Sequence, residues 1–418
     1  MPLSDPTSGL LRFSAAPAPS TPLGPFEDSA VAWATWVTLM GFVGVTALAL
    51  MAAGPAARRI GADALAAVTA RLARAAVVLA VLAFAAVLTD LAHSGDSGGY
   101  HYKAAWNALY DGTNAGRLSG LEVTMLLVGA ALIAPLAFRG AANGRARKGL
   151  LTAGLGAGMI ALGTTRFPDA MPEEWGHTIF ETAMWMLHLF GGAIWLGGLA
   201  GLALLAVPGA VPSAERSAFW SPAIRRFSAA AMSCVTAITL SGLFLYWEHV
   251  DGPSQLFTTM YGRVLGVKIL IFGTLLLLGV FNQFWLHPRI DALRAAGDER
   301  PLRTILVRQF PAVVTVETLL GMSLLFVAPF LHGSARNQAF QAETAKHSAI
   351  AISPEDLPRR PDKVVSASTW VLGSTETIAL IALMIGGYWF SGVLARRRTA
   401  AAAPGPKPAT ATGDLVEA

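Results

Sequence analysis

Nine continuous apolar blocks, most of them long enough to cross a lipid bilayer, constrain this chain more than any other feature of its sequence. A helix needs about 20 residues to cross the ~30 Å of hydrocarbon in a membrane. The blocks are continuously apolar and do not alternate every second residue, which favours helices over the strands of a barrel. We therefore predict an all-α, polytopic membrane bundle of about nine transmembrane helices. The blocks are 31–53, 73–93, 120–138, 149–165, 177–206, 225–249, 262–286, 310–331 and 366–394.

Composition supports this fold class and excludes several functions. Only 14% of the 418 residues are charged, where a soluble domain has roughly a quarter. The net charge of +5 comes mostly from basic loop residues, so it indicates topology and not nucleic-acid binding. Cys234 is the single cysteine, which excludes an intrachain disulfide and a cysteine-based metal cluster. The chain also lacks a G-x-x-x-x-G-K-[ST] phosphate loop, so we expect no nucleotide as a partner.

Basic residues concentrate in alternate loops, and this predicts the orientation of the bundle. Loops with an excess of Lys and Arg stay in the cytoplasm. We therefore predict an outside N-terminus and a cytoplasmic C-terminus. The 332–365 loop is an exception, because five basic residues accompany four acidic ones there. The basic residues of the other loops and the tail include Arg58, Arg59, Arg71, Arg139, Arg145, Arg147, Lys148, Arg216, Arg225, Arg226, Arg289, Arg294, Arg300, Arg303, Arg308, Arg396, Arg397 and Arg398.

The order of the blocks suggests four parts along the chain. Residues 1–30 are rich in Pro, Ser and Ala and are predicted to be a disordered leader, and 395–418 a disordered cytoplasmic tail. Between them we expect a four-helix membrane part over 31–165 and a five-helix part over 177–394.

Histidines gather toward the predicted outer side of the membrane, where seven of the eight fall. One block carries His177, Glu181, Met184 and His188, spaced so that all four lie on one face of a helix, about one per turn. Imidazole suits copper and zinc, and thioether sulfur favours Cu(I), so this face is a candidate ladder for a copper ion reaching about 16 Å into the membrane. The alternative is that His177 and Glu181 are ordinary interfacial residues and His188 bonds a neighbouring helix.

Other polar residues lie at similar depths. We count His93, His249 and His332, which close three other blocks, among the candidate metal ligands. Lys268, Glu317 and Glu376 are ionisable residues inside apolar blocks, where such residues usually mark a pathway or a buried pair. An ion pair of Lys268 with Glu317 or Glu376 would lock the bundle, whereas the two glutamates could instead carry protons that exchange against a cation. The sequence leaves both open.

Several motifs together resemble a known family. The segment from His188 to Gly198 has the form H-x-x-x-x-x-x-W-L-G-G, and it is followed in order by Arg225-Arg-Phe-Ser228, Ser241-Gly242, Tyr261-Gly-Arg-Val-Leu-Gly-Val-Lys268 and Val316-Glu317. This series is similar to the copper resistance D (CopD/PcoD) membrane proteins over about 177–331. The resemblance implies copper handling in the cytoplasmic membrane of a bacterium. The N-terminal helices and the last helix lie outside it, and we expect no Met/His-rich extracytoplasmic copper-binding domain to be fused to them.

We therefore expect a copper transporter or copper-delivery permease and not an enzyme. The expected cofactor or cargo is a copper ion, and a separate extracytoplasmic copper-binding protein is a possible partner besides the lipid bilayer. Two alternatives remain open. A b-type haem electron carrier could use His93, His249 and His332 as axial ligands, although no inner-half histidine pair exists for a second haem. A scaffold or assembly factor for a copper enzyme would bind metal without moving it.

Overall fold

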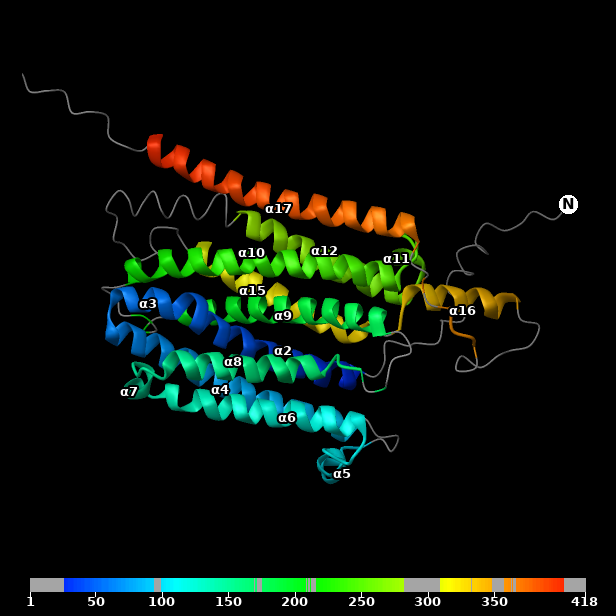
Figure 1. Cartoon of the computed structure of the whole chain (residues 1–418), viewed down its shortest axis with the longest axis horizontal. Helices are drawn as coiled ribbons and strands as arrows, with labels where there is room; N and C mark the ends of the chain where they lie inside the picture. Colours follow the sequence, from blue (N-terminus) through cyan, green and yellow to red (C-terminus); the bar gives the residue numbers. More distant parts are fainter. Residues whose placement is uncertain are drawn as a thin grey trace, which may run out of the picture.

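The computed structural model of the chain describes residues 26–93, 99–168, 170, 175–207, 209, 211, 216–281, 309–331, 333–347, 357–361, 363 and 366–401. These residues form helices and connecting turns, with no strand among them (Figure 1). The helices are α2 (Phe26–Leu48), α3 (Gly54–Ile60), α4 (Ala62–His93), α5 (Tyr102–Ala108), α6 (Asn114–Ile133), α7 (Arg139–Ala142), α8 (Arg147–Thr164), α9 (Trp175–Ala206), α10 (Arg216–His249), α11 (Gln255–Thr258), α12 (Met260–Phe281), α15 (Gln309–Val327), α16 (Ala335–His347) and α17 (Ala367–Ala401).

The all-helical membrane bundle is confirmed, with eight candidate spans in the described part of the chain. Eight of the nine blocks, including the extended first one, form helices that are long and apolar enough to span a membrane. The block at 149–165 does not. That block forms α8, an 18-residue helix that begins with Arg147 and Lys148 and is rich in glycine, so its hydropathy is low. It nevertheless lies beside α6 and α2 within the bundle (Figure 1). The described residues thus hold eight candidate spans and the shorter helix α8, against the expected number of about nine.

The first helix is longer than the block that predicted it. It begins at Phe26, inside the stretch assigned to the leader, and passes through a π-helical segment at Ala49–Ala53 into α3. Glu27 and Asp28 occupy its first turn, where negative side chains interact favourably with the helix dipole. Pro55 lies at the second position of α3, where its missing amide hydrogen costs little.

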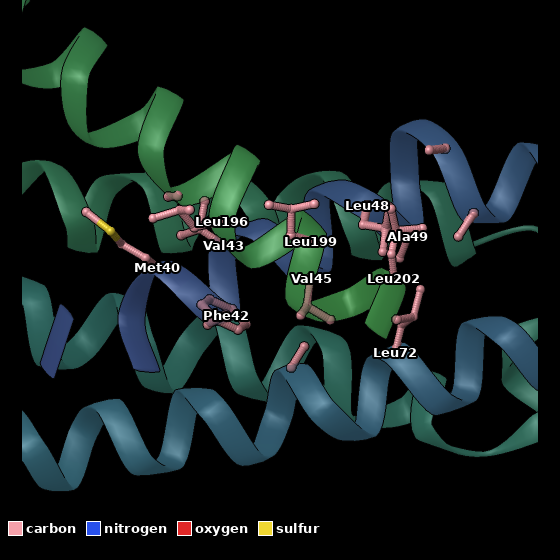
Figure 2. Close-up of a cluster of buried hydrophobic side chains, with 14 of the residues drawn as sticks. Met40, Phe42, Val43, Val45, Leu48, Ala49, Leu72, Leu196, Leu199 and Leu202 are labelled. Atoms are coloured by element: carbon pink, nitrogen blue, oxygen red, sulfur yellow. The ribbon is translucent and has the colours of Figure 1, made fainter. Parts of the chain in front are cut away.

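The core of the bundle is centred on α2, which packs against α4 on one side and α9 on the other. Figure 2 shows side chains from these helices meeting there: Met40, Phe42, Val43, Val45, Leu48, Ala49, Leu72, Leu196, Leu199 and Leu202. The α2–α9 crossing depends on two glycines. A Cβ atom on Gly44 would lie 2.2 Å from the backbone oxygen of Ala193, and one on Gly197 would lie 2.6 Å from that of Met40. Small residues of this kind let membrane helices approach closely.

The bundle has two ends with different loops (Figure 1). We call the end with α5, α11 and α16 the α16 end, and the opposite end, with α3 and α7, the α3 end. The predicted orientation would put the α16 end outside the cell and the basic α3 end in the cytoplasm. The division into a four-helix and a five-helix part stays a prediction, and α2 and α9 pack across it in one core.

Candidate functional site

The four residues of the predicted ladder lie along α9, toward the α16 end. His177 is exposed in the first turn of the helix, and Glu181, Met184 and His188 are half-buried. Within the described residues, no group of three or more His, Cys, Asp or Glu side chains is close enough together to hold a metal ion. The ladder therefore stays a prediction.

His188 faces the neighbouring helix α10. Its Nδ1 atom lies 3.1 Å from Oγ of Ser241, a fully buried residue, and its ring lies over Gly242, where an added Cβ would be 3.5 Å from Cε1. The Ser241 hydroxyl donates its one proton to the backbone oxygen of Ala237 at 2.6 Å. The serine oxygen is thus an acceptor toward His188, which assigns the proton of the imidazole to Nδ1. Nε2 then carries the lone pair that a metal ion needs.

His249, at the end of α10, has the same arrangement. Its Nδ1 atom is 2.8 Å from the backbone oxygen of Leu245, and because a carbonyl can only accept, Nδ1 carries the proton. Its ring stacks on Tyr261 of α12 at 5.9 Å. His249 is eight residues beyond Ser241, or about 12 Å along the helix axis. His188 and His249 are therefore two separate positions, each with Nδ1 held by a protein oxygen, and His188 also lies by the backbone oxygen of Ile238.

Trp185 connects these two histidines. Its ring makes edge contacts with His188 at 6.5 Å and with His249 at 6.4 Å between centroids. The guanidinium of Arg166 lies over the same indole at 4.1 Å, in cation–π geometry. The sequence analysis did not single out Trp185 or Arg166, although the position of Trp185 three residues before His188 on α9 was a signal for it.

Charged groups surround this part of the bundle. Arg166 is close enough to Glu181 for electrostatic attraction, and both Arg166 and Lys268 interact repulsively with a charged His188. Two positive side chains thus lie near His188. Lys268 itself is half-buried on α12.

The other predicted residues are dispersed. Nε2 of His93, on α4, lies 2.5 Å from a carboxylate oxygen of Asp28 on α2, and its ring stacks on Tyr100. This ion pair holds His93 among the N-terminal helices. Glu317 is buried on α15, and Glu376 is exposed on α17. The pairing of Lys268 with either glutamate stays a prediction. His332 lies outside the described residues.

A cap at the α16 end covers the position of His249. Gln338 of α16 accepts a hydrogen bond from the amide of Tyr261 at 3.0 Å, and Lys363 donates to the backbone oxygen of Val250 at 2.9 Å. Asp251, two residues after His249, lies 3.6 Å from Arg336 and 3.7 Å from Lys363 and also pairs with Arg360. One carboxylate thus joins α10 to the 335–363 region.

Comparison with known proteins finds a family match over the helices from α10 to α15. Residues 221–331 match the family described as Copper resistance protein D, which confirms the expected resemblance over that region. The match begins after α9, so the segment from His188 to Gly198 lies outside it. The chain is also 35% identical over 96 residues to the copper transport protein CutJ of Bacillus subtilis (strain 168). That alignment spans 23% of this chain and 17% of the relative's length. No solved structure matches the chain.

Proposed function

We propose that this chain moves copper across the cytoplasmic membrane of a bacterium, or delivers it there, through His249 and His188. The observation that carries the proposal is the pair of imidazoles that both contact Trp185, each held by a hydrogen bond at Nδ1 to a protein oxygen. His249 lies within the region that matches the copper resistance family, and His188 contacts that region through Ser241.

The path begins at the α16 end, taken as the outer face. Exposed His177 and half-buried Glu181 would attract the ion, with a separate extracytoplasmic copper-binding protein as a possible donor. The ion then binds the imidazole of His249 and passes along Trp185 to His188, with the Met184 thioether favouring Cu(I). Because His188 faces Ser241, and His249 lies two turns beyond Ser241 on α10, copper would occupy the two histidines in turn.

Coupling to another ion would come from the charged residues deeper in the bundle. Glu317 is buried in α15, and a buried carboxyl group can take up and release a proton as a cation passes. Lys268 interacts with the His188 region electrostatically, so its charge would oppose a second cation at that position. We assign Glu317 and Lys268 to this coupling and leave Glu376, on the exposed surface of α17, as a lesser candidate.

Purified protein in sealed vesicles tests the proposal. We expect copper flux in the unaltered protein and a loss of about tenfold or more in His188→Ala and His249→Ala. His347→Ala is the matched control, because that histidine is exposed on α16 outside the proposed path. Flux that is unchanged in both path variants would refute the path. A visible haem band in the purified protein would instead support the electron carrier, and bound copper without flux would support the delivery or scaffold function.

A further inference from the structure

A buried arginine at the α3 end has no function in the copper path. Arg147 is the first residue of α8 and only 5% exposed. Its Nη1 atom lies 2.9 Å from the place a Cβ on Gly54 would occupy, so the guanidinium lies against the start of α3, next to the π-helical segment of α2. Any side chain at position 54 would displace it. The guanidinium of Arg147 therefore fits in this position because residue 54 has no side chain.

Within the described residues, the guanidinium of Arg147 has neither a hydrogen-bond acceptor nor a carboxylate partner, and its recorded electrostatic neighbour is Arg58. Arg58, one turn after Gly54, is positive too and repels it. Asp63 is the one acidic residue in segments 54–75, 139–150 and 216–230. Two neighbouring arginines with one acidic residue in these segments make the place positive, and a positive place favours an anion.

The first turn of α8, which begins at Arg147, adds hydrogen-bond donors. Ala146, the residue before the helix, has no side-chain oxygen to accept from the amides of Lys148 and Gly149, whereas the amide of Arg147 is bonded to the backbone oxygen of Gly144. Free amides and the positive end of the helix dipole together favour a phosphate group. The start of α8 also lies at the α3 end of the bundle (Figure 1).

We propose that Arg147, together with Arg58 and the first-turn amides of α8, binds a phosphate anion, supplied by an anionic phospholipid headgroup or by free phosphate. This site is independent of the copper path. Arginine suits it because its planar guanidinium can form two parallel hydrogen bonds to phosphate oxygens.

Native mass spectrometry of the purified full-length protein tests the proposal, with cardiolipin, phosphatidylglycerol or phosphatidylcholine added. We expect Arg147→Gln to lower the retention of the two anionic lipids by roughly fivefold or more and to leave phosphatidylcholine unchanged. Arg58→Gln should also lower the retention of the anionic lipids. Because Arg58 is exposed, this variant tests the site even if Arg147→Gln fails to fold. Arg145→Gln is the matched control, with the same loss of charge at an exposed position two residues away.

A second arm separates the two sources of phosphate. If inorganic phosphate alone raises the melting temperature of the unaltered protein but not of Arg58→Gln or Arg147→Gln, the ligand is free phosphate. If only anionic lipid does so, the ligand is the headgroup. Equal lipid loss in Arg145→Gln, or no effect of either ligand, would overturn the proposal.

Discussion

Nδ1 of His188 on α9 lies 3.1 Å from Oγ of Ser241 on α10, and the serine has already given its proton to the backbone. This bond fixes both the orientation of the imidazole and the nitrogen that carries its proton. The identity of residue 241 therefore decides which histidine nitrogen faces the space that copper would occupy.

Replacing Ser241 by alanine tests that relationship. We expect Ser241→Ala to lower copper affinity by about 10- to 100-fold, because the imidazole loses the group that orients it. Ser233→Ala is the control, since Ser233 is an exposed serine of the same helix that bonds only to Ala229. Isothermal titration with Cu(I) measures the effect. If the two variants bind copper equally well, His188 does not ligate the metal through this geometry.

The close crossing of α2 and α9 gives a prediction about stability. A methyl group on Gly197 would lie 2.6 Å from the backbone oxygen of Met40, so Gly197→Ala must push the helices apart. We expect it to destabilise the protein by about 1–3 kcal/mol. Gly192→Ala on the same helix has open space around it and should change stability by less than about 1 kcal/mol. Denaturant unfolding in detergent compares the two variants, and similar stability for both would contradict the crossing.

The cap at the α16 end should loosen when its shared carboxylate is removed. Asp251→Asn leaves Arg336 and Lys363 without their negative partner, and Arg336 is buried. We expect faster hydrogen exchange over 335–347 and a loss of about 1–3 kcal/mol. Glu343→Gln removes an exposed carboxylate within α16 and should cost less than about 1 kcal/mol. Unchanged exchange in Asp251→Asn would mean that Asp251 does not hold the cap.

The stability of the turn before α6 should depend on pH in the acidic range. Asp111 accepts hydrogen bonds from the amide and the hydroxyl of Thr113, and these bonds lower the pKa of its carboxyl group below the ordinary value. A lowered pKa in the folded state adds stability above the ordinary pKa, and this stability is lost as pH falls through the folded value. We expect hydrogen exchange at Thr113 and Gly116, corrected for intrinsic rates, to rise below about pH 4. Asp111→Asn should abolish this pH dependence.

Accessibility labelling tests the predicted orientation. In a Cys234→Ala background, which removes the single cysteine, His177→Cys should react with a membrane-impermeant maleimide in intact cells. Arg145→Cys, exposed at the α3 end, should react only after lysis. The reverse pattern would put the α16 end in the cytoplasm and would contradict the proposal that copper enters from outside the cell.

The membrane helices could be predicted from the sequence, although α4 begins at Ala62 and not at 73 and α10 begins at Arg216 and not at 225, but the site could not. Apolar blocks set helix type because a backbone in hydrocarbon must satisfy its own hydrogen bonds. The extension of α2 back to Phe26 and the pairing of His93 with Asp28 required the structure, since each depends on neighbouring helices. The spacing that aligned His177, Glu181, Met184 and His188 placed them on one face but could not say what that face contacts.

The sequence by itself determined that this chain is a helical membrane bundle whose imidazoles lie mostly toward one side, because both properties are local to each block. Only the tertiary structure decided that His188 and His249 share Trp185 as a neighbour, that each holds its Nδ1 proton on a protein oxygen, and that Arg147 is buried against Gly54. Those relationships join residues from different helices. They depend on how closely the helices pack, and a pattern within one helix does not contain that information.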